Sequence, residues 1–142
     1  MISVADFMTK ELVTVRATDD VALAESLLRL GGIRHLPVVS GGRLVGLVTQ
    51  RDLLRGAAGP RERPVEAVMT REVTSVRPGT GLAQAARLML ERKFGCLPVC
   101  DDAGVLLGIV TEADFVRFAA DVVQDLDLVA RAVRGDGDPD RA

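Results

Sequence analysis

Apolar residues along the chain form either short runs typical of strands or positions three to four residues apart, typical of helices. The same order of these patterns occurs twice. Short apolar or alternating runs, each bounded by turn-forming residues, predict strands. These runs lie at residues 13–15, 36–39, 44–48, 74–76, 97–100 and 105–110. Because Pro37 and Pro98 have no N–H to donate to a sheet, we expect each of them at a strand start or on a sheet edge.

Two stretches between these runs have apolar positions three or four residues apart, which predicts amphipathic helices. The positions are Val21, Ala24, Leu27 and Leu28 in the first stretch and Leu82, Ala85, Ala86, Leu88 and Met89 in the second. We expect Thr18 to cap the first helix and Gly31-Gly32 to end it. A further helix begins at Thr49, and its counterpart begins at Thr111 and continues to about Arg134.

The sequence pattern of the first half of the chain recurs in the second half, and Val65 is the counterpart of Val4. We expect repeat 1 at 4–56, a Gly- and Pro-rich linker at 57–64, repeat 2 at 65–118, a helical extension at 119–134 and a disordered polar tail at 135–142. Each repeat is predicted to be β-α-β-β-α. One such unit is too small to be stable alone, so we predict an α/β (α+β) fold with two repeats packed sheet to sheet as a pseudo-two-fold pair.

Composition narrows the function. The net charge of −2 and the absence of Trp and Tyr argue against nucleic-acid binding. No apolar run is long enough for a membrane span, and no signal peptide is expected. Cys96 and Cys100 would lie roughly 13 Å apart on one strand, too far for a disulfide, which favours the cytoplasm. One histidine and no nucleophile, metal or Walker motif argue against an enzyme.

The segments after the last strand of each repeat carry the most informative motif. Gly46-Leu47-Val48-Thr49 leads to Asp52, and Gly108-Ile109-Val110-Thr111 leads to Asp114. A Thr-x-x-Asp segment is by itself a helix capping box. The same carboxylate could also accept from the two hydroxyls of a ribose, and the glycine would let a ligand or a backbone segment approach closely. Both readings stay open, and they are compatible.

The doubled set of motifs resembles a tandem pair of CBS domains, the Bateman module, and the chain looks like a stand-alone bacterial-type CBS protein. The resemblance rests on Met-Thr near each start, the Leu-Pro-Val strands and the Gly-x-x-Thr-x-x-Asp endings. It implies a regulatory module that binds AMP, ADP, ATP or S-adenosylmethionine, requires no cofactor, forms a homodimer of pairs and signals to a separate effector protein. The alternative is a ligand-free dimerisation and interaction scaffold.

The resemblance also implies the ligand-binding residues. Asp52 and Asp114 would bind ribose, and Thr49 and Thr111 would bind ribose or phosphate. The adenine slot would be lined by backbone near Thr14 and Ser75 and by the Leu-Pro-Val strands, namely Leu36, Pro37, Val38, Leu97, Pro98 and Val99.

The two repeats differ just before Leu-Pro-Val. Repeat 1 has Arg34-His35, similar to the basic pair of the family, whereas repeat 2 has Gly95-Cys96. We therefore expect one stronger phosphate site, formed by Arg34 and His35 with a possible contribution from Arg51, and a second site near Cys96 for a less charged ligand or none. His35 could equally be a partly packed residue beside a strand, and Cys96 fits a small apolar residue better than a redox sensor.

The apolar stripe of the long last helix exceeds what one small repeat needs to bury, so it is a candidate dimer contact.

Overall fold

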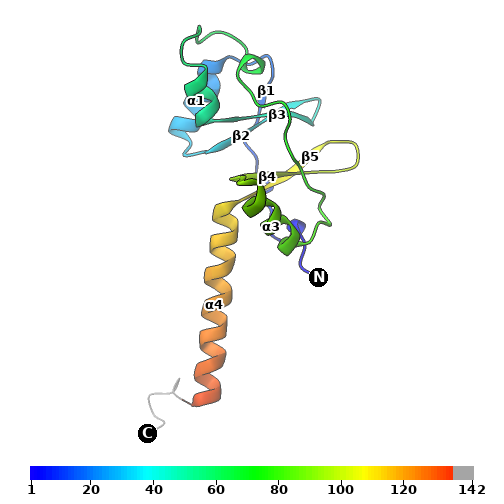
Figure 1. Ribbon diagram of the computed structural model, residues 1–142, viewed down its shortest axis with the longest axis vertical. Coiled ribbons are helices and arrows are strands. Elements are labelled where there is room, and N and C mark those ends of the chain that lie inside the picture. Colours follow the sequence, from blue (N-terminus) through cyan, green and yellow to red (C-terminus); the bar gives the residue numbers. More distant parts are fainter. Residues whose placement is uncertain (136–142) are drawn as a thin grey trace. The chain divides into compact units, whose positions relative to one another are not determined.

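The computed structural model describes residues 1–135 and has mixed α and β structure (Figure 1). The predicted tail lies outside these residues except for Gly135. The chain divides into two units at Val110/Thr111. The elements are the 3-10 helices Val4–Asp6 and Val65–Ala67, β1 (Val15–Arg16), α1 (Val21–Leu30), β2 (His35–Ser40), β3 (Arg43–Thr49), α2 (Gln50–Arg55), α3 (Leu82–Arg92), β4 (Cys96–Cys100), β5 (Leu106–Thr111) and α4 (Glu112–Arg134).

Repeat 1 contains a three-stranded sheet in the order β1-β2-β3. β1 pairs with β2 in parallel, with Val15 opposite Val38, and β2 and β3 form the predicted antiparallel hairpin. Gly41 and Gly42 have φ angles of 56° and 82°, the left-handed conformation that a tight hairpin turn requires and that glycine adopts without strain.

Repeat 2 contains a two-stranded sheet of β4 and β5, and the predicted strand at 74–76 is wrong. Only a single bridge forms there, between Val76 and Val99. Val76 donates to the Pro98 carbonyl and accepts from the Cys100 N–H, both at 2.9 Å. The next residue on that edge that could donate is residue 78, which is a proline, so the ladder stops after one residue.

The expectation for Pro37 is also wrong, because it is the third residue of β2, the central strand of its sheet. Pro98 lies on a sheet edge as expected, because β4 belongs to a two-stranded sheet. The pairing of β4 with Val76 begins at the carbonyl of Pro98, which accepts from the Val76 N–H. The nitrogen of Pro98 points to the same side but precedes this first hydrogen bond, so its missing N–H costs the sheet no hydrogen bond.

Helix α1 begins at Val21 and is not capped by Thr18, since its N-cap residue is Asp20 and no side chain caps it. Linker carbonyls take that role: Val21 donates to Arg63 at 2.9 Å and Ala22 donates to Arg61 at 3.0 Å. The linker is therefore folded along the start of α1. The predicted end at Gly31-Gly32 is confirmed. Most of the predicted apolar positions of the two helices are buried, while three are half-buried: Leu27, Ala86 and Leu88.

The start of repeat 2 completes the core of repeat 1. Val65 is fully buried in one apolar cluster with Val15, Ala24, Leu28, Leu36, Val38 and Val48. Its N–H donates to the Asp19 carbonyl at 2.7 Å. Further along the segment, Thr70 and Leu47 exchange two backbone hydrogen bonds of 2.9 Å, which add a short antiparallel bridge to β3.

The start of repeat 1 packs reciprocally on repeat 2. Thr9 and Ile109 exchange backbone bonds of 2.8 and 3.0 Å, and the buried Val4 donates to Thr80 at 2.9 Å. The tips of the two hairpins also pair, since Leu44 donates to Gly104 and Leu106 donates to Gly42, both at 3.0 Å. The two repeats are thus joined by exchanged segments. The predicted face-to-face packing of their sheets stays a prediction.

The exchange explains the glycine of each Gly-x-x-Thr segment. A Cβ at Gly46 would lie 2.5 Å from Met69 Sδ and 3.0 Å from the Thr70 carbonyl oxygen. A Cβ at Gly108 would lie 2.6 Å from Met8 Sδ and 3.0 Å from the Thr9 carbonyl oxygen. The sequence allowed close approach of a ligand or of a backbone segment at these glycines, and in the structure a protein segment lies there. Met8 and Met69 thus fill the space between the exchanged segments and these glycines.

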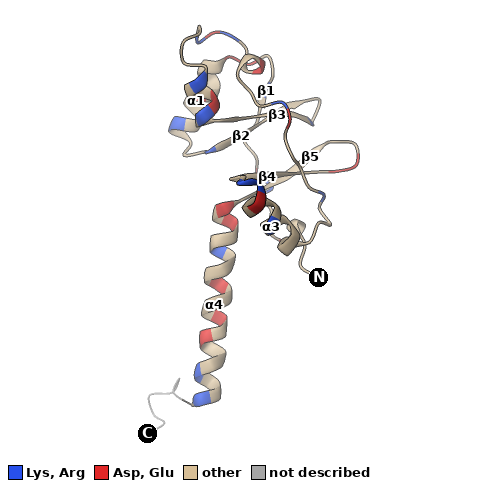
Figure 2. Cartoon of the chain, viewed as in Figure 1, with Lys and Arg blue, Asp and Glu red and all other residues tan. Residues whose placement is uncertain are grey.

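Helix α4 is the described part of the second unit and extends over 23 residues to Arg134, as predicted. Acidic and basic residues are interspersed along it (Figure 2). Most of its large apolar residues are exposed, namely Val116, Val122, Val123, Leu126, Leu128, Val129 and Val133, whereas Phe115 and Phe118 are half-buried. Across residues 1–135, no helix is both long enough and apolar enough to cross a membrane.

We predict that Gly46→Ala destabilises the fold by about 1–3 kcal/mol, because the added methyl group collides with Met69 and with a backbone carbonyl that is fixed by sheet bonding. Gly79→Ala is the matched control, since a Cβ there meets nothing within 4 Å and should change stability by less than about 0.5 kcal/mol. Urea unfolding followed by far-UV circular dichroism measures both. Equal effects of the two substitutions would contradict the exchanged-segment account.

Candidate functional site

The carboxylate of Asp52 is the centre of a polar cluster at the end of β3. The side chain is only 6% exposed. Asp52 Oδ2 accepts from the backbone N–H of Thr49 at 2.8 Å and from its hydroxyl at 3.1 Å, while Thr49 Oγ1 accepts from the Asp52 N–H at 3.5 Å. This is the predicted capping box.

A third donor to Asp52 comes from the exchanged segment. The Thr70 hydroxyl donates to Asp52 Oδ1 at 3.0 Å. Sequence reasoning missed this residue, because it treated Met-Thr only as a marker of each repeat start. The only available signal was its recurrence, Met8-Thr9 and Met69-Thr70, at the same place in both repeats.

His35 lies beside this cluster. It is directly opposite Thr49 in the β2–β3 register, and it is half-buried. A Cβ placed on Gly95 would lie 2.7 Å from His35 Nε2, so the imidazole packs against the backbone of repeat 2. Gly95 occupies the place in repeat 2 that Arg34 has in repeat 1. The absence of a side chain at Gly95 therefore leaves room for the imidazole.

Arg34 and Arg51 are both exposed. Arg34 directly precedes His35, and Arg51 lies on α2 between Thr49 and Asp52. Their chain positions place both near the cluster, while phosphate contact by either residue stays a prediction.

The two Leu-Pro-Val segments belong to the core. Their six residues are buried, with Leu36, Val38, Leu97 and Val99 fully inaccessible: Leu36, Pro37, Val38, Leu97, Pro98 and Val99. Ligand contact by their side chains would require the core to open. The predicted adenine slot along these strands therefore stays a prediction, and Thr14, exposed and next to β1, is the predicted residue of that slot in repeat 1 that reaches the surface.

Cys96 is 6% exposed, and burial raises the pKa of its thiol to about 12. Burial also raises the pKa of Cys100, although a hydrogen bond with Ser75 opposes that shift. Both cysteines are free. Protonated, enclosed thiols are poor nucleophiles, which supports the apolar role of Cys96 over a redox role.

The second unit contains the matching carboxylate, Asp114. Its Oδ2 accepts from the Thr111 N–H at 2.8 Å and from the Thr111 hydroxyl at 3.2 Å, which completes a second capping box. Its Oδ1 is paired with the guanidinium of Arg117, one turn along α4. A ligand diol at Asp114 would compete with a cation, whereas one at Asp52 would compete with a neutral hydroxyl.

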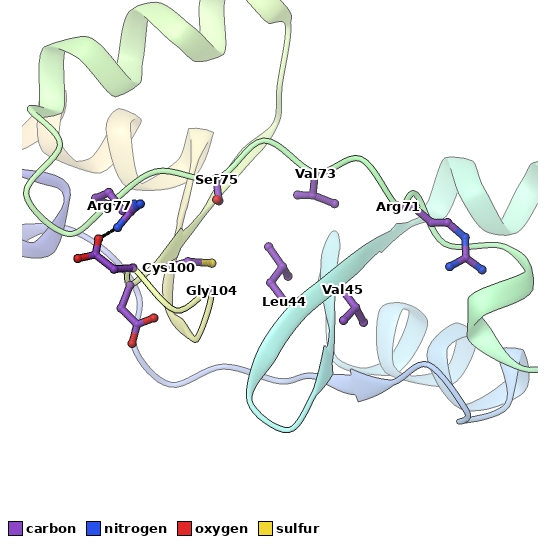
Figure 3. A pocket seen from close by; sticks show the side chains of 10 residues that line it. Leu44, Val45, Arg71, Val73, Ser75, Arg77, Cys100 and Gly104 are labelled. Atoms are coloured by element: carbon purple, nitrogen blue, oxygen red, sulfur yellow. Dashed lines mark ion pairs between the residues drawn. The ribbon is translucent and has the colours of Figure 1, made fainter.

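Ser75 lies at a different place from the Asp52 cluster. It lines a cavity of about 260 Å³ with Leu44, Val45, Arg71, Val73, Arg77, Cys100, Asp101, Asp102 and Gly104 (Figure 3). Figure 3 shows Leu44, Val45 and Val73 between Arg71 at one end and Arg77, which is paired with Asp102, at the other. None of Thr49, Asp52 and His35 lines this cavity, so Ser75 does not join them.

The protein-family model described as "CBS domain" matches the chain twice, at residues 4–59 and 65–121. The chain belongs to the CBS domain family. The motifs from which the resemblance was drawn lie within these two matches.

Relatives with this pair occur as small proteins and as parts of larger ones. The CBS domain-containing protein YhcV of Bacillus subtilis is 37% identical over 117 residues, which cover 80% of this chain and 83% of YhcV. The inosine-5'-monophosphate dehydrogenase of Korarchaeum cryptofilum is 36% identical over 108 residues, 76% of this chain but only 22% of the enzyme. The chain thus spans less than half the length of most of the curated relatives it matches.

Solved structures match the CBS pair over most of the chain. The acetoin utilization protein AcuB of Vibrio cholerae has a TM-score of 0.82 and 39% identity and covers 89% of this chain and 96% of AcuB. CBSX2, solved in complex with AMP, has a TM-score of 0.79 and 36% identity and covers 86% of this chain and 98% of CBSX2. The cytosolic domain of the Mg²⁺ channel MgtE, solved with ATP, has a TM-score of 0.71 and 34% identity and covers 82% of this chain and 48% of that one.

We predict that Cys96 makes the protein less stable at alkaline pH. The unfolded thiol ionises near its ordinary pKa of about 9 and the folded one near 12, so the unfolded state holds fewer protons between these values. The free energy of unfolding should therefore fall by up to about 1.4 kcal/mol per pH unit from this group alone. Cys96→Ala should remove that slope in urea unfolding at pH 8 to 11. Identical pH slopes for the two proteins would contradict the assignment.

Proposed function

We propose that this chain is a regulatory module that binds an adenosine-containing ligand, AMP, ADP, ATP or S-adenosylmethionine, and needs no other cofactor. The observation that carries the proposal is the buried Asp52 carboxylate, held at its orientation by Thr49 and Thr70 beside the imidazole of His35. Oδ1 of this carboxylate has the Thr70 hydroxyl as its donor and keeps one acceptor position, which can take a hydroxyl group of a ribose. Structural neighbours solved with AMP, with ATP, or with methylthioadenosine and S-adenosylmethionine support the ligand class.

Regulation would follow from differential binding. A ligand that favours one arrangement of the two repeats shifts the population toward it, and a separate effector protein would respond to that arrangement. We propose no catalytic reaction for this chain. Its buried, free cysteines suit a reducing compartment, and we propose the cytoplasm as its location.

A ligand-free scaffold is the second candidate. One observation favours it: in each capping box the carboxylate already holds its helix start, and its other oxygen already has a donor, Thr70 or Arg117. Under that function both aspartates would serve the fold alone.

We predict that AMP, ADP, ATP or S-adenosylmethionine at about 100 times its dissociation constant stabilises the protein by about 2.7 kcal/mol, which corresponds to roughly 10 °C in Tm. Asp52→Asn should reduce the affinity by about 10- to 100-fold, because charge-assisted bonds to the ribose are lost. Thermal unfolding followed by far-UV circular dichroism measures the shift, and each variant is compared with its own ligand-free Tm because the substitution also weakens a helix cap.

Asp114→Asn makes the same change in the second capping box. Its effect on the ligand-induced Tm shift reports whether the second carboxylate is a separate ligand site. GTP tests base selectivity. If no adenosine ligand shifts the Tm of protein shown to be free of nucleotide, the scaffold function stands instead.

We further propose that the chain forms a homodimer to which α4 contributes. Val122, Leu126, Val129 and Val133 are 37–82% exposed and follow one another at spacings of four, three and four residues, the pattern of a helix–helix seam. In a heptad with Leu126 and Val133 at position a and Val122 and Val129 at position d, Asp125 is the charged residue among the flanking e and g positions of this run.

Leu126→Glu should therefore shift the protein toward the monomer in size-exclusion chromatography with light scattering, because it places a charge in the seam. Gln124→Glu adds the same charge outside the seam and should leave the assembly unchanged. A dimer that survives Leu126→Glu would exclude α4 from the interface.

A further inference from the structure

The acceptor capacity of Asp52 is almost fully used within the protein. A carboxylate has about four lone-pair positions, two on each oxygen. Oδ2 accepts from the N–H and the hydroxyl of Thr49, and Oδ1 accepts from the Thr70 hydroxyl. One position on Oδ1 is left. A ligand with one hydroxyl group can use it, whereas a vicinal diol needs two.

Of the three donors, Thr70 is the one that a ligand can displace. The Thr49 N–H is fixed by the backbone at the start of α2, and the Thr49 hydroxyl both donates to Oδ2 and accepts from the Asp52 N–H. The Thr70 hydroxyl makes a single bond to Oδ1 from a residue that is exposed to solvent. When it turns away, water can satisfy it at little cost.

The backbone of Thr70 does not need to move for this. Two hydrogen bonds to Leu47 fix its position, and the preceding Met69 packs against Gly46. The hydroxyl can therefore leave Oδ1 by rotation about χ1 alone. Because Thr70 belongs to the start of repeat 2 and Asp52 to repeat 1, each displacement breaks a bond between the repeats.

We propose that a ribonucleotide bound at Asp52 displaces the hydroxyl of Thr70, so that this residue sets the discrimination between ribose and deoxyribose and releases one contact between the repeats on binding. The inference rests on the function proposed above, and it adds a specificity-determining residue outside the Thr-x-x-Asp motif. A difference in contact between bound and free states is what a regulatory ligand requires.

The test compares AMP with 2'-deoxy-AMP by isothermal titration calorimetry in an Asp114→Asn background, so that the Asp52 site alone reports. Thr70→Val removes the competing donor and should tighten AMP binding by about five- to tenfold, the magnitude of one hydrogen bond. It should leave 2'-deoxy-AMP unchanged, because a single hydroxyl needs no displacement. Thr70→Ala should behave as Thr70→Val does, and Thr70→Ser should restore the original ratio of the two affinities.

Thr9→Val is the matched control. Thr9 has the same place in the other exchanged segment, paired with Ile109, so the ratio at Asp52 should not change. The inference predicts that Thr70→Val and Thr70→Ala raise the ratio of the AMP affinity to the 2'-deoxy-AMP affinity. If this ratio stays the same or falls in both variants, the inference is overturned while the proposed function stands. No AMP binding by the unsubstituted protein overturns the proposed function, and this inference with it.

Discussion

Two reciprocal pairs of backbone hydrogen bonds, Thr70 with Leu47 and Thr9 with Ile109, are the constraint on which the rest of this structure depends. Each joins the start of one repeat to the last strand of the other. The buried Val65 can enter the core of repeat 1 only because its segment is held there. The glycines at 46 and 108 follow from the same pairing, since a methionine and a carbonyl oxygen occupy the space of a side chain. Neither repeat is therefore a complete folding unit by itself.

Much of this architecture could be predicted because it is local. The hairpin turn at Gly41-Gly42, the helical spacing of α1 and α3 and the two capping boxes each depend on residues within one or two turns of one another. The errors came from long-range effects. The strand at 74–76 failed because Pro78 ends a ladder with a distant strand. The cap of α1 failed because carbonyls of the linker replace Thr18. Pro78 is visible in the sequence, but no local pattern indicates that Val76 meets β4 or that linker carbonyls meet the start of α1.

The candidate site divides in the same way. Thr49 and Asp52 could be predicted from their spacing, and His35 joins them because the hairpin register puts it opposite Thr49. Thr70 could not be predicted, because its bond to Asp52 exists only through the exchange of segments. Ser75 lies in a cavity apart from this cluster because residues 73, 75 and 77 share one face of an extended segment, and the sequence alone does not indicate what that face meets. The Leu-Pro-Val side chains belong to the core, and here too the sequence alone does not indicate which face of the strand is buried.

The crystal structure of the protein with AMP tests the central claim most directly. The account predicts that the ribose hydroxyls lie within about 3 Å of the Asp52 carboxylate, with the Thr70 hydroxyl turned away from Oδ1 and its backbone still paired with Leu47. AMP bound elsewhere, for example in the cavity lined by Ser75 and Arg77, with the Thr70–Asp52 bond intact, would contradict it.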